Sequence, residues 1–199
     1  MICVMATQNR GKLSELHAAG LPFACKALSD WTLQQADETG STFIENAIIK
    51  ARHASAITGM PALADDSGLM LPSLGGEPGV RSARYAGDHG DFDAHMDLLL
   101  SNLQKQPDYS RVACFVAVLV YLKTLDDPMP LVFQGQWWGE VIDEKRGEYG
   151  FGYDPIFFDP KAGKTAAEML PEEKNSLSHR AKALALLKDY ASQHQETFE

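Results

Sequence analysis

The apolar run SRVACFVAVLVYLK, residues 110–123, constrains the fold of this chain more than any other segment. Apolar side chains occupy both alternating sets of positions in it, and valines stand at positions 112, 116, 118 and 120. β-Branched residues of this kind fit a pleated strand better than a helix. The run therefore predicts a central strand that is covered on both faces.

A partner strand is predicted in LVFQGQWWGEVI, which runs from Leu131 to Ile142. The turn between the two strands contains Asp126, Asp127, Pro128 and Pro130. Strands joined by so short a turn pair in antiparallel fashion. We therefore expect a mixed sheet.

Helical patterns surround these strands. The segment from Thr42 to Gly59 begins with a capping-box pattern, Thr42 followed by Glu45, and ends at a glycine that suits a helix stop. Apolar spacing predicts further helices at about residues 12–19, 92–103 and 178–193, and strands at 2–5, 21–28 and 62–66. The expected fold class is α/β, with a mixed central β-sheet flanked by helices.

Length and charge limit the class of protein. A chain of 199 residues, 45% of them hydrophobic, can bury its own core, and we expect a single domain over residues 1–199 that has two lobes. The formal charge of -9 argues against a nucleic-acid polymer as partner, because binding many phosphates needs clustered Lys and Arg. An anionic substrate would need a local basic pocket or a metal ion.

Cysteine usage and hydropathy bear on location. There is no run of 18 apolar residues and no signal-peptide pattern, so we expect neither a membrane segment nor export. Cys3, Cys25 and Cys114 lie far apart in the sequence and form no CxxC pair. This pattern indicates that the cysteines act as small apolar residues in a reducing compartment, by default the cytoplasm, and do not form disulfides or a zinc site. The stretch LGGEPGV, residues 74–80, is too short to mark a domain boundary.

Two adjacent carboxylates, Asp65 and Asp66, stand where the strand from Ala62 is expected to end. Successive side chains of a strand point to opposite faces, so one acid can enter a cleft while the other supports the structure. Carboxylates at a strand end commonly serve Mg²⁺. The alternative is a polar turn, because Asp, Ser and Gly in DDSG all favour turns.

Other polar residues also allow two interpretations each. Glu45 is either the capping partner of Thr42 or an acid near a metal ion. Lys174, His179 and Arg180 lie just before and within the first turn of the last predicted helix, where cations oppose the helix dipole. They form either a clamp for a polyphosphate or carbonyl, or a solvent-exposed basic turn.

The stretch GEYGFGYDP, residues 147–155, combines three glycines with the aromatic residues Tyr149, Phe151 and Tyr153. The glycines permit positive φ and close backbone approach, and the rings offer faces on which a base could stack. The alternative is a tight β-turn whose aromatic residues face the core.

The stretch ATQNRGK, residues 6–12, follows the first predicted strand but does not match a P-loop. No glycine stands five residues before Gly11, and Leu13 occupies the place of the hydroxyl residue that would bind Mg²⁺. This argues against a Walker-type ATPase or kinase. A polar turn before a helix N-terminus remains, with Thr7 and Asn9 as donors and Lys12 as a positive charge.

Seven segments occur in order between Ala6 and Leu184: ATQNRGK, TFIENAIIKARHA, PALADDSGL, LGGEPGVRSARYAG, GEYGFGYDPIFF, GKTAAEM and EEKNSLSHRAKAL. Together they resemble the inosine triphosphate pyrophosphatases, the family of non-standard purine nucleoside triphosphate pyrophosphatases. The first motif departs from the family pattern, which is usually T-G-N or T-N-N, because Gln8 stands between Thr7 and Asn9.

The resemblance implies a two-lobed α/β homodimer with a cleft, and Mg²⁺-dependent hydrolysis of a nucleoside triphosphate between its α and β phosphates. It implies that Asp66 is the catalytic acid-base and metal residue, and that Glu45 is a second acid near the metal. The remaining residues would bind the substrate: Thr7, Gln8, Asn9, Arg10, Gly11, Lys12, Ser67, Phe151, Gly152, Tyr153, Asp154, Lys174, His179 and Arg180.

The expected substrates are ITP, dITP and XTP, whose 6-oxo group accepts hydrogen bonds that donors from Arg180, His179 or the backbone could supply. Two other functions remain open. One is a septum-inhibitor-like pyrophosphatase for modified or pyrimidine nucleotides, against which the SHR and FGYDP motifs argue. The other is a nucleotide-binding regulator without turnover.

Overall fold

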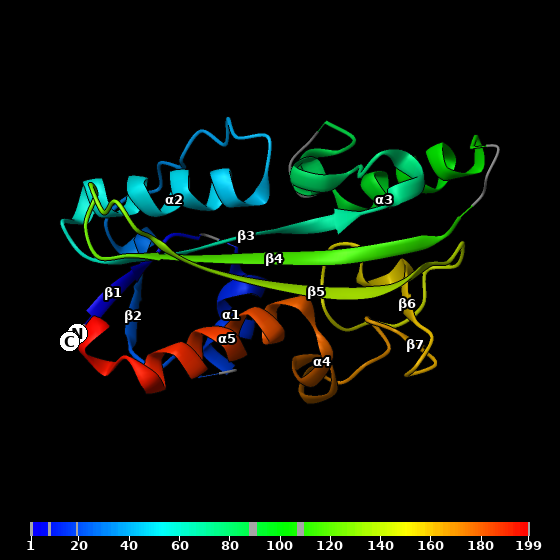
Figure 1. Ribbon diagram of the computed structural model, residues 1–199. Coiled ribbons are helices and arrows are strands. Elements are labelled where there is room, and N and C mark those ends of the chain that lie inside the picture. Colours follow the sequence, from blue (N-terminus) through cyan, green and yellow to red (C-terminus); the bar gives the residue numbers. More distant parts are fainter. Residues whose placement is uncertain (1, 8, 19, 88–90, 107–109, 199) are drawn as a thin grey trace. The chain divides into compact units, whose positions relative to one another are not determined.

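The computed structural model describes residues 2–7, 9–18, 20–87, 91–106 and 110–198 (Figure 1). Its strands are β1 Ile2–Met5, β2 Ala24–Ala27, β3 Ala62–Met70, β4 Val112–Leu122, β5 Leu131–Val141, β6 Phe157–Asp159 and β7 Lys164–Thr165. Its α-helices are α1 Arg10–Ala18, α2 Phe43–Thr58, α3 Phe92–Gln104, α4 Pro171–Leu177 and α5 His179–Gln193. Short 3-10 helices cover Leu28–Asp30, Pro72–Leu74, Gly79–Arg84, Asp154–Ile156 and Gln195–Thr197.

The seven strands form one mixed sheet in the order β2-β1-β3-β4-β5-β6-β7. Strand β1 is parallel to β2 and β3, whereas β6 is antiparallel to β5 and β7. The backbone N–H of Val141, at the end of β5, donates to the carbonyl of Arg111, just before β4. The predicted antiparallel pair and mixed sheet are therefore confirmed.

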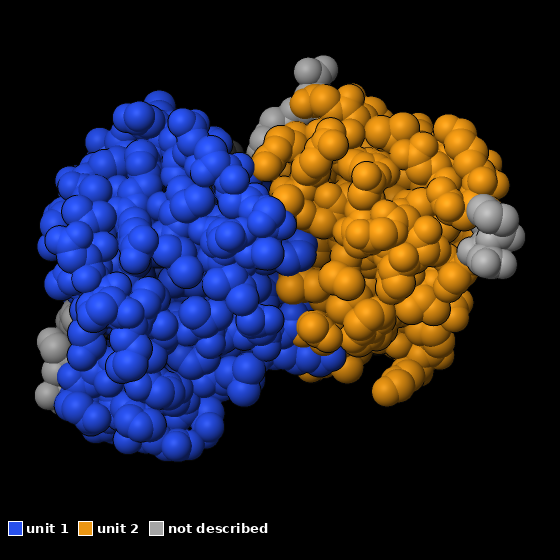
Figure 2. Space-filling view, turned by 45° about the horizontal axis from the view of Figure 1, so that its top comes forward, with its two compact units in different colours: residues 1–66, 117–135, 179–199 blue, residues 67–116, 136–178 orange. Residues whose placement is uncertain are grey.

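The chain divides into two compact units, which Figure 2 shows in different colours. Unit 1 comprises residues 1–66, 117–135 and 179–199, and unit 2 comprises residues 67–116 and 136–178. Strands β3, β4 and β5 contribute residues to both units.

Unit 1 has a core on the face of its strands that α1 and α5 cover, while α2 covers the other face (Figure 1). The buried residues of this core include Met5, Leu16, Leu63, Leu119 and Leu187. The small residues Ala47, Ala51 and Ala54 are buried along α2. The core packs against β1, which lies between β2 and β3 in the sheet. The end of β1 is thereby fixed, and with it the start of the turn that follows this strand.

Unit 2 has a separate core, rich in aromatic side chains. It includes Leu99 and Leu103 of α3, Trp137 of β5 and Phe157 of β6. The indole N–H of Trp137 donates to the buried carboxylate of Asp159 at 2.8 Å, which satisfies both polar groups inside the core.

Several predicted elements are confirmed. Ten of the eleven residues of β4 are buried, as expected for a strand covered on both faces. Helix α2 has the predicted capping box between Thr42 and Glu45, and it ends at Gly59, whose φ of 66° is left-handed. Among the described residues, no helix is both long and apolar enough to cross a membrane.

The prediction that β3 ends at Asp65 and Asp66 is wrong, because the strand continues to Met70. The Ser-Gly pair that favoured a turn lies inside the strand. A Cβ at Gly68 would collide with the carbonyl of Gly79 and the side chain of Ser82, so the glycine serves close packing within unit 2. The two carboxylates are thus fixed in mid-strand.

Other boundaries differ modestly from the predictions. Strand β2 covers only residues 24–27 of the predicted 21–28, and α1 begins at Arg10 instead of Lys12. The predicted last helix is α5, and Lys174 lies on a separate short helix, α4.

Candidate active site

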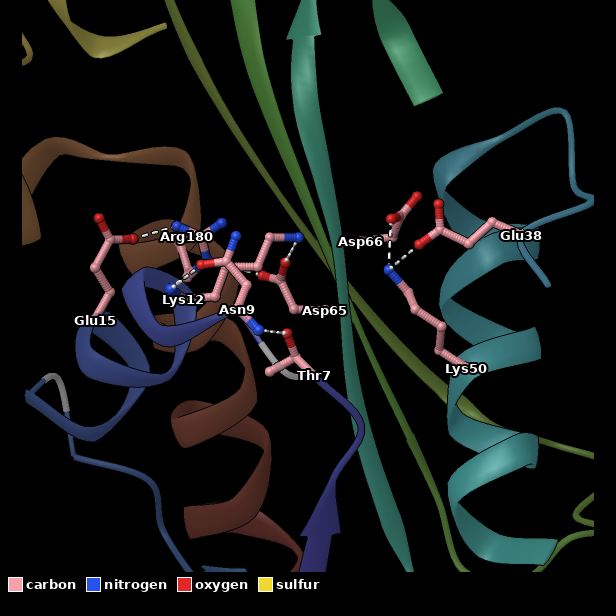
Figure 3. Close-up of polar contacts among 9 residues, drawn as sticks. All are labelled: Thr7, Asn9, Lys12, Glu15, Glu38, Lys50, Asp65, Asp66 and Arg180. Atoms are coloured by element: carbon pink, nitrogen blue, oxygen red, sulfur yellow. Dashed lines mark hydrogen bonds and ion pairs between the residues drawn. The ribbon is translucent and has the colours of Figure 1, made fainter. Parts of the chain in front are cut away.

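The turn after β1 is organised by its own polar side chains. The hydroxyl of Thr7 accepts a hydrogen bond from the backbone N–H of Asn9 at 3.2 Å, and the Asn9 side-chain oxygen accepts one from the N–H of Lys12 at 3.1 Å (Figure 3). Asn9 therefore caps the N-terminus of α1, which begins with Arg10 and Gly11. Gln8 and the side chain of Arg10 lie outside the described residues.

Asp65 joins α1 to α5 through buried ion pairs. Its Oδ1 lies 2.6 Å from Lys12 Nζ, and its Oδ2 accepts a hydrogen bond from Arg180 Nε at 2.8 Å. Arg180 also pairs with Glu15 of α1 through Nη1. Burial opposes the ionised form of Asp65, but the charges of Arg180 and Lys12 outweigh it and hold the pKa of Asp65 well below its usual range. Asp65 is thus an ionised structural carboxylate.

Asp66 belongs to a second cluster, on the α2 side of β3. Its Oδ1 lies 2.6 Å from Lys50 Nζ, and Lys50 Nζ lies 3.2 Å from Glu38 Oε1. The second oxygen of Asp66, Oδ2, is buried and has no hydrogen-bond partner among the described residues. Burial raises the pKa of Asp66 despite the neighbouring charges of Lys50 and Lys12. An oxygen of this kind is a candidate acceptor for a proton or a ligand for a metal ion.

The alternation of side chains in β3 separates the two clusters, as predicted for adjacent strand residues. Figure 3 shows Asp65 on the α1 side of the strand and Asp66 on the α2 side. Both oxygens of Asp65 pair with cationic side chains, whereas Asp66 Oδ2 has no hydrogen-bond partner among the described residues.

The donor set around Asp66 fits Mg²⁺. The described residues include no group of three or more His, Cys, Asp or Glu side chains placed to hold a metal ion. Mg²⁺ does not require such a group, because it commonly takes one or two carboxylates and completes its shell with waters and phosphate oxygens. Asp66 and Glu38, which share Lys50, supply two carboxylates in the same cluster.

Glu45 lies at the start of α2 and acts as its cap. Its Oε2 accepts hydrogen bonds from the backbone N–H groups and hydroxyls of Ser41 and Thr42, at 2.8 to 3.0 Å. The capping interpretation is therefore confirmed, and the metal-binding role of Glu45 stays a prediction.

No sequence motif identified Lys50 and Glu38 as members of this cluster. Lys50 follows Asn46 by four positions and Ala47 by three, so it lies on the buried side of α2. A lysine among the small buried residues of one helix face indicates a buried cation that needs an acidic partner, and this pattern could have identified Lys50. Glu38 lies in an irregular segment, where no periodicity pointed to it.

Unit 2 contains a third polar cluster, formed by Asp154 and Lys174. Lys174 Nζ lies 2.6 Å from Asp154 Oδ2, and both residues are buried. The same ammonium group lies 5.0 Å from the ring centroid of Phe151, whose backbone N–H donates to Asp154 Oδ2 at 2.8 Å. A Cβ at Gly150 would collide with the Asp154 carboxylate, so only glycine fits there.

The remaining residues of GEYGFGYDP have different environments. Gly152 has a φ of 69°, which explains the need for glycine. Tyr153 is buried, and its hydroxyl donates to the carbonyl of Ser82 at 2.9 Å. The core-facing alternative is thus confirmed for Tyr153, whereas Phe151 is only half-buried.

The predicted basic cluster is divided between units. His179 and Arg180 are buried at the start of α5 in unit 1, and Lys174 pairs with Asp154 in unit 2. A Cβ at Gly135 of β5 would collide with the carbonyl of His179 and the N–H of Ala183. Close contact with β5 thus fixes the first turn of α5. Ser67 follows Asp66 in β3 and is the first residue of unit 2.

Comparison with known proteins gives consistent matches over nearly the whole chain. The model of the Ham1 family matches residues 3–190. A dITP/XTP pyrophosphatase of Erwinia tasmaniensis is 54% identical over 188 residues, which cover 94% of this chain and 92% of the relative. A dITP/XTP pyrophosphatase of Pectobacterium atrosepticum is 52% identical over 188 residues, which cover 94% of this chain and 95% of the relative. The structure of a HAM1 protein from Coxiella burnetii superposes with a TM-score of 0.91 at 44% identity, covering 97% of this chain and 99% of that one.

Proposed function

Because the chain belongs to the Ham1 family, we propose that it is a pyrophosphatase that hydrolyses dITP, ITP and XTP to the nucleoside monophosphate and pyrophosphate. The observation that carries this proposal is the contrast between the two acids of β3. Asp65 is neutralised by Lys12 and Arg180, whereas Asp66 keeps a buried oxygen without a partner. The chain thus holds one carboxylate for structure and one for chemistry.

The triphosphate binds at the turn from Thr7 to Lys12. Backbone N–H groups at a helix N-terminus attract anions, and Lys12 lies on the first turn of α1. Gln8, Asn9, Arg10 and Gly11 complete this segment, and Ser67 contacts the substrate beside Asp66. These cations and dipoles neutralise the substrate in a protein whose net charge is -9.

Asp66 holds or deprotonates the water that attacks the α-phosphorus, and pyrophosphate leaves. Burial raises the pKa of this carboxyl, which makes its ionised form a stronger base than an exposed aspartate. Asp66 and Glu38 would hold the metal ion, with Glu45 as the further acid that the family resemblance implies. Mg²⁺ when bound neutralises phosphate charge and lowers the pKa of water.

The family resemblance assigns recognition of the base to residues of GEYGFGYDP in unit 2 and to residues at the start of α5 in unit 1. Phe151 stacks on the purine, and Gly152, Tyr153, Asp154 and Lys174 shape its surroundings. Donors from His179 and Arg180 pair with the 6-oxo group and would be left unpaired by the 6-amino group of adenine. Sites that depend on such donors can discriminate by roughly 10⁴-fold.

We also propose a homodimer that resides in the cytoplasm, as the family resemblance implies. Light scattering of the purified protein checks the first part, and fractionation of cells that contain the protein checks the second.

A substrate panel tests the proposed reaction. The purified protein is incubated with Mg²⁺ and ITP, dITP, XTP, GTP, ATP or dTTP, and pyrophosphate release is measured. Fast release from ITP, dITP and XTP is expected. A preference for dTTP would indicate a septum-inhibitor-like enzyme, and nucleotide binding without release would indicate a regulator; either result contradicts the proposal.

A further inference from the structure

Two cysteines that are 22 positions apart in the sequence face each other on neighbouring strands of unit 1. Cys3 of β1 and Cys25 of β2 are direct partners in the parallel register, and their Sγ atoms lie 2.7 Å apart. Both are free thiols. No local motif indicates this pairing, because the two residues form no CxxC motif.

The two thiols differ in access. Cys3 is fully buried, whereas Cys25 is half-buried and lies on β2, the edge strand of the sheet. The hydrogen bond with Cys25 and burial both raise the pKa of the Cys3 thiol, so Cys3 is protonated near neutral pH. A soluble oxidant therefore reaches Cys25 first, and Cys3 is placed to react second.

We propose that Cys3 and Cys25 form an oxidation site that reacts with small disulfides such as oxidised glutathione and closes to an intramolecular disulfide. The Cys25 thiolate attacks one sulfur of oxidised glutathione, forms a mixed disulfide and releases one glutathione thiolate. Cys3 then loses its proton and attacks Cys25 Sγ, which releases the second glutathione. Two protein thiols are oxidised, and one oxidised glutathione is reduced to two thiols.

The new bond would enclose the segment that contains the turn at residues 7–12 and all of α1. It would also tie the edge strand β2 covalently to β1. Neighbouring strands lie about 4.8 Å apart, which is within the Cα separations of about 4.4–6.8 Å that disulfides allow, so the closure needs little backbone movement. This proposal rests on the cysteine geometry and is independent of the proposed enzymatic function.

The test treats the folded protein with oxidised glutathione, then alkylates the remaining thiols and maps disulfide-linked peptides by mass spectrometry. We expect loss of two of the three thiols and a linked peptide pair that joins Cys3 to Cys25. The variant C114S should behave identically, because Cys114 lies buried in β4 and takes no part. The variant C3S should accumulate glutathione on Cys25, because no second thiol is present to displace it.

Three outcomes would overturn the proposal. One is a stable glutathione adduct on Cys25 of the unaltered protein, which would mean that Cys3 does not attack. Another is a bond that includes Cys114. The third is that the folded protein keeps all three thiols, although a urea-unfolded sample treated in the same way is oxidised.

Discussion

Asp65 and Asp66 are consecutive residues of β3, yet they belong to different ion-pair networks. Asp65 lies 2.6 Å from Lys12 Nζ and 2.8 Å from Arg180 Nε, whereas Asp66 lies 2.6 Å from Lys50 Nζ (Figure 3). The period of two residues in a strand produces this separation. It predicts that the two acids respond differently to the same substitution.

The variant D65N should lose stability. It leaves Lys12 and Arg180 as buried cations without their shared carboxylate, and breaking a buried ion pair in this way costs about 3–5 kcal/mol. Denaturant unfolding followed by circular dichroism measures the change. The control D93N alters an exposed aspartate that pairs with Lys145, and it should unfold like the unaltered protein. Equal stability of D65N and D93N would contradict the structural role of Asp65.

Protonation of Asp65 should lower the free energy of unfolding in acid. Its pKa is lower in the folded protein than in the unfolded chain, where it is about 4. The unfolded chain therefore takes up this proton first, so the contribution of Asp65 is fully present above about pH 4 and is lost as the pH falls toward the folded-state pKa. Unfolding free energies measured between pH 3 and 7 should show a weaker acid dependence in D65N. An unchanged slope would show that other groups govern acid unfolding.

The sequence predicted the elements whose signals are local. The capping box of Thr42 and Glu45 and the stop at Gly59 defined α2, and the apolar residues of 110–123 defined β4. The end of β3 was misplaced because Ser67 and Gly68 favour turns locally, whereas close packing against Ser82 keeps Gly68 in the strand. A tertiary contact thus overrode a local preference.

The candidate site was only partly predictable for the same reason. The candidate residues were identified from motifs, but their partners come from distant segments: Glu15 and Asp65 hold Arg180, and Lys50 links Asp66 to Glu38. Pairings over such separations leave no periodic trace in the sequence. The same is true of Cys3 and Cys25.

Glu38 and Glu45 can be distinguished by their Mg²⁺ dependence. The variant E38Q removes a carboxylate that shares Lys50 with Asp66, so half-maximal activity should require roughly tenfold or more Mg²⁺. The matched variant E45Q changes the cap of α2 and should lower the melting temperature slightly without altering the Mg²⁺ requirement. Titration of activity with Mg²⁺ measures both. A shift in E45Q alone would instead support the metal role that the family resemblance implied for Glu45.

Gly135 should tolerate no side chain. A methyl group there would collide with the carbonyl of His179 and the N–H of Ala183, and α5 would have to shift. Overpacking of this kind costs roughly 1–3 kcal/mol, and we expect G135A to lose both stability and activity. The control Q134A changes the adjacent, exposed residue of β5 and should have little effect on either. Thermal unfolding and ITP hydrolysis of the two variants provide the comparison.

The most direct test of the central claim is the variant D66N, measured for ITP turnover, nucleotide binding and stability. Asn keeps the shape of the side chain but cannot accept the proton of the attacking water, so kcat should fall by roughly 10²–10⁴-fold. Binding of ITP should change little. The unfolding free energy should fall less than in D65N, because Lys50 keeps Glu38 as a partner at 3.2 Å and burial already opposes the charge of Asp66. Full turnover by D66N, or a loss of activity explained entirely by unfolding, would contradict the assignment of Asp66 as the catalytic carboxylate.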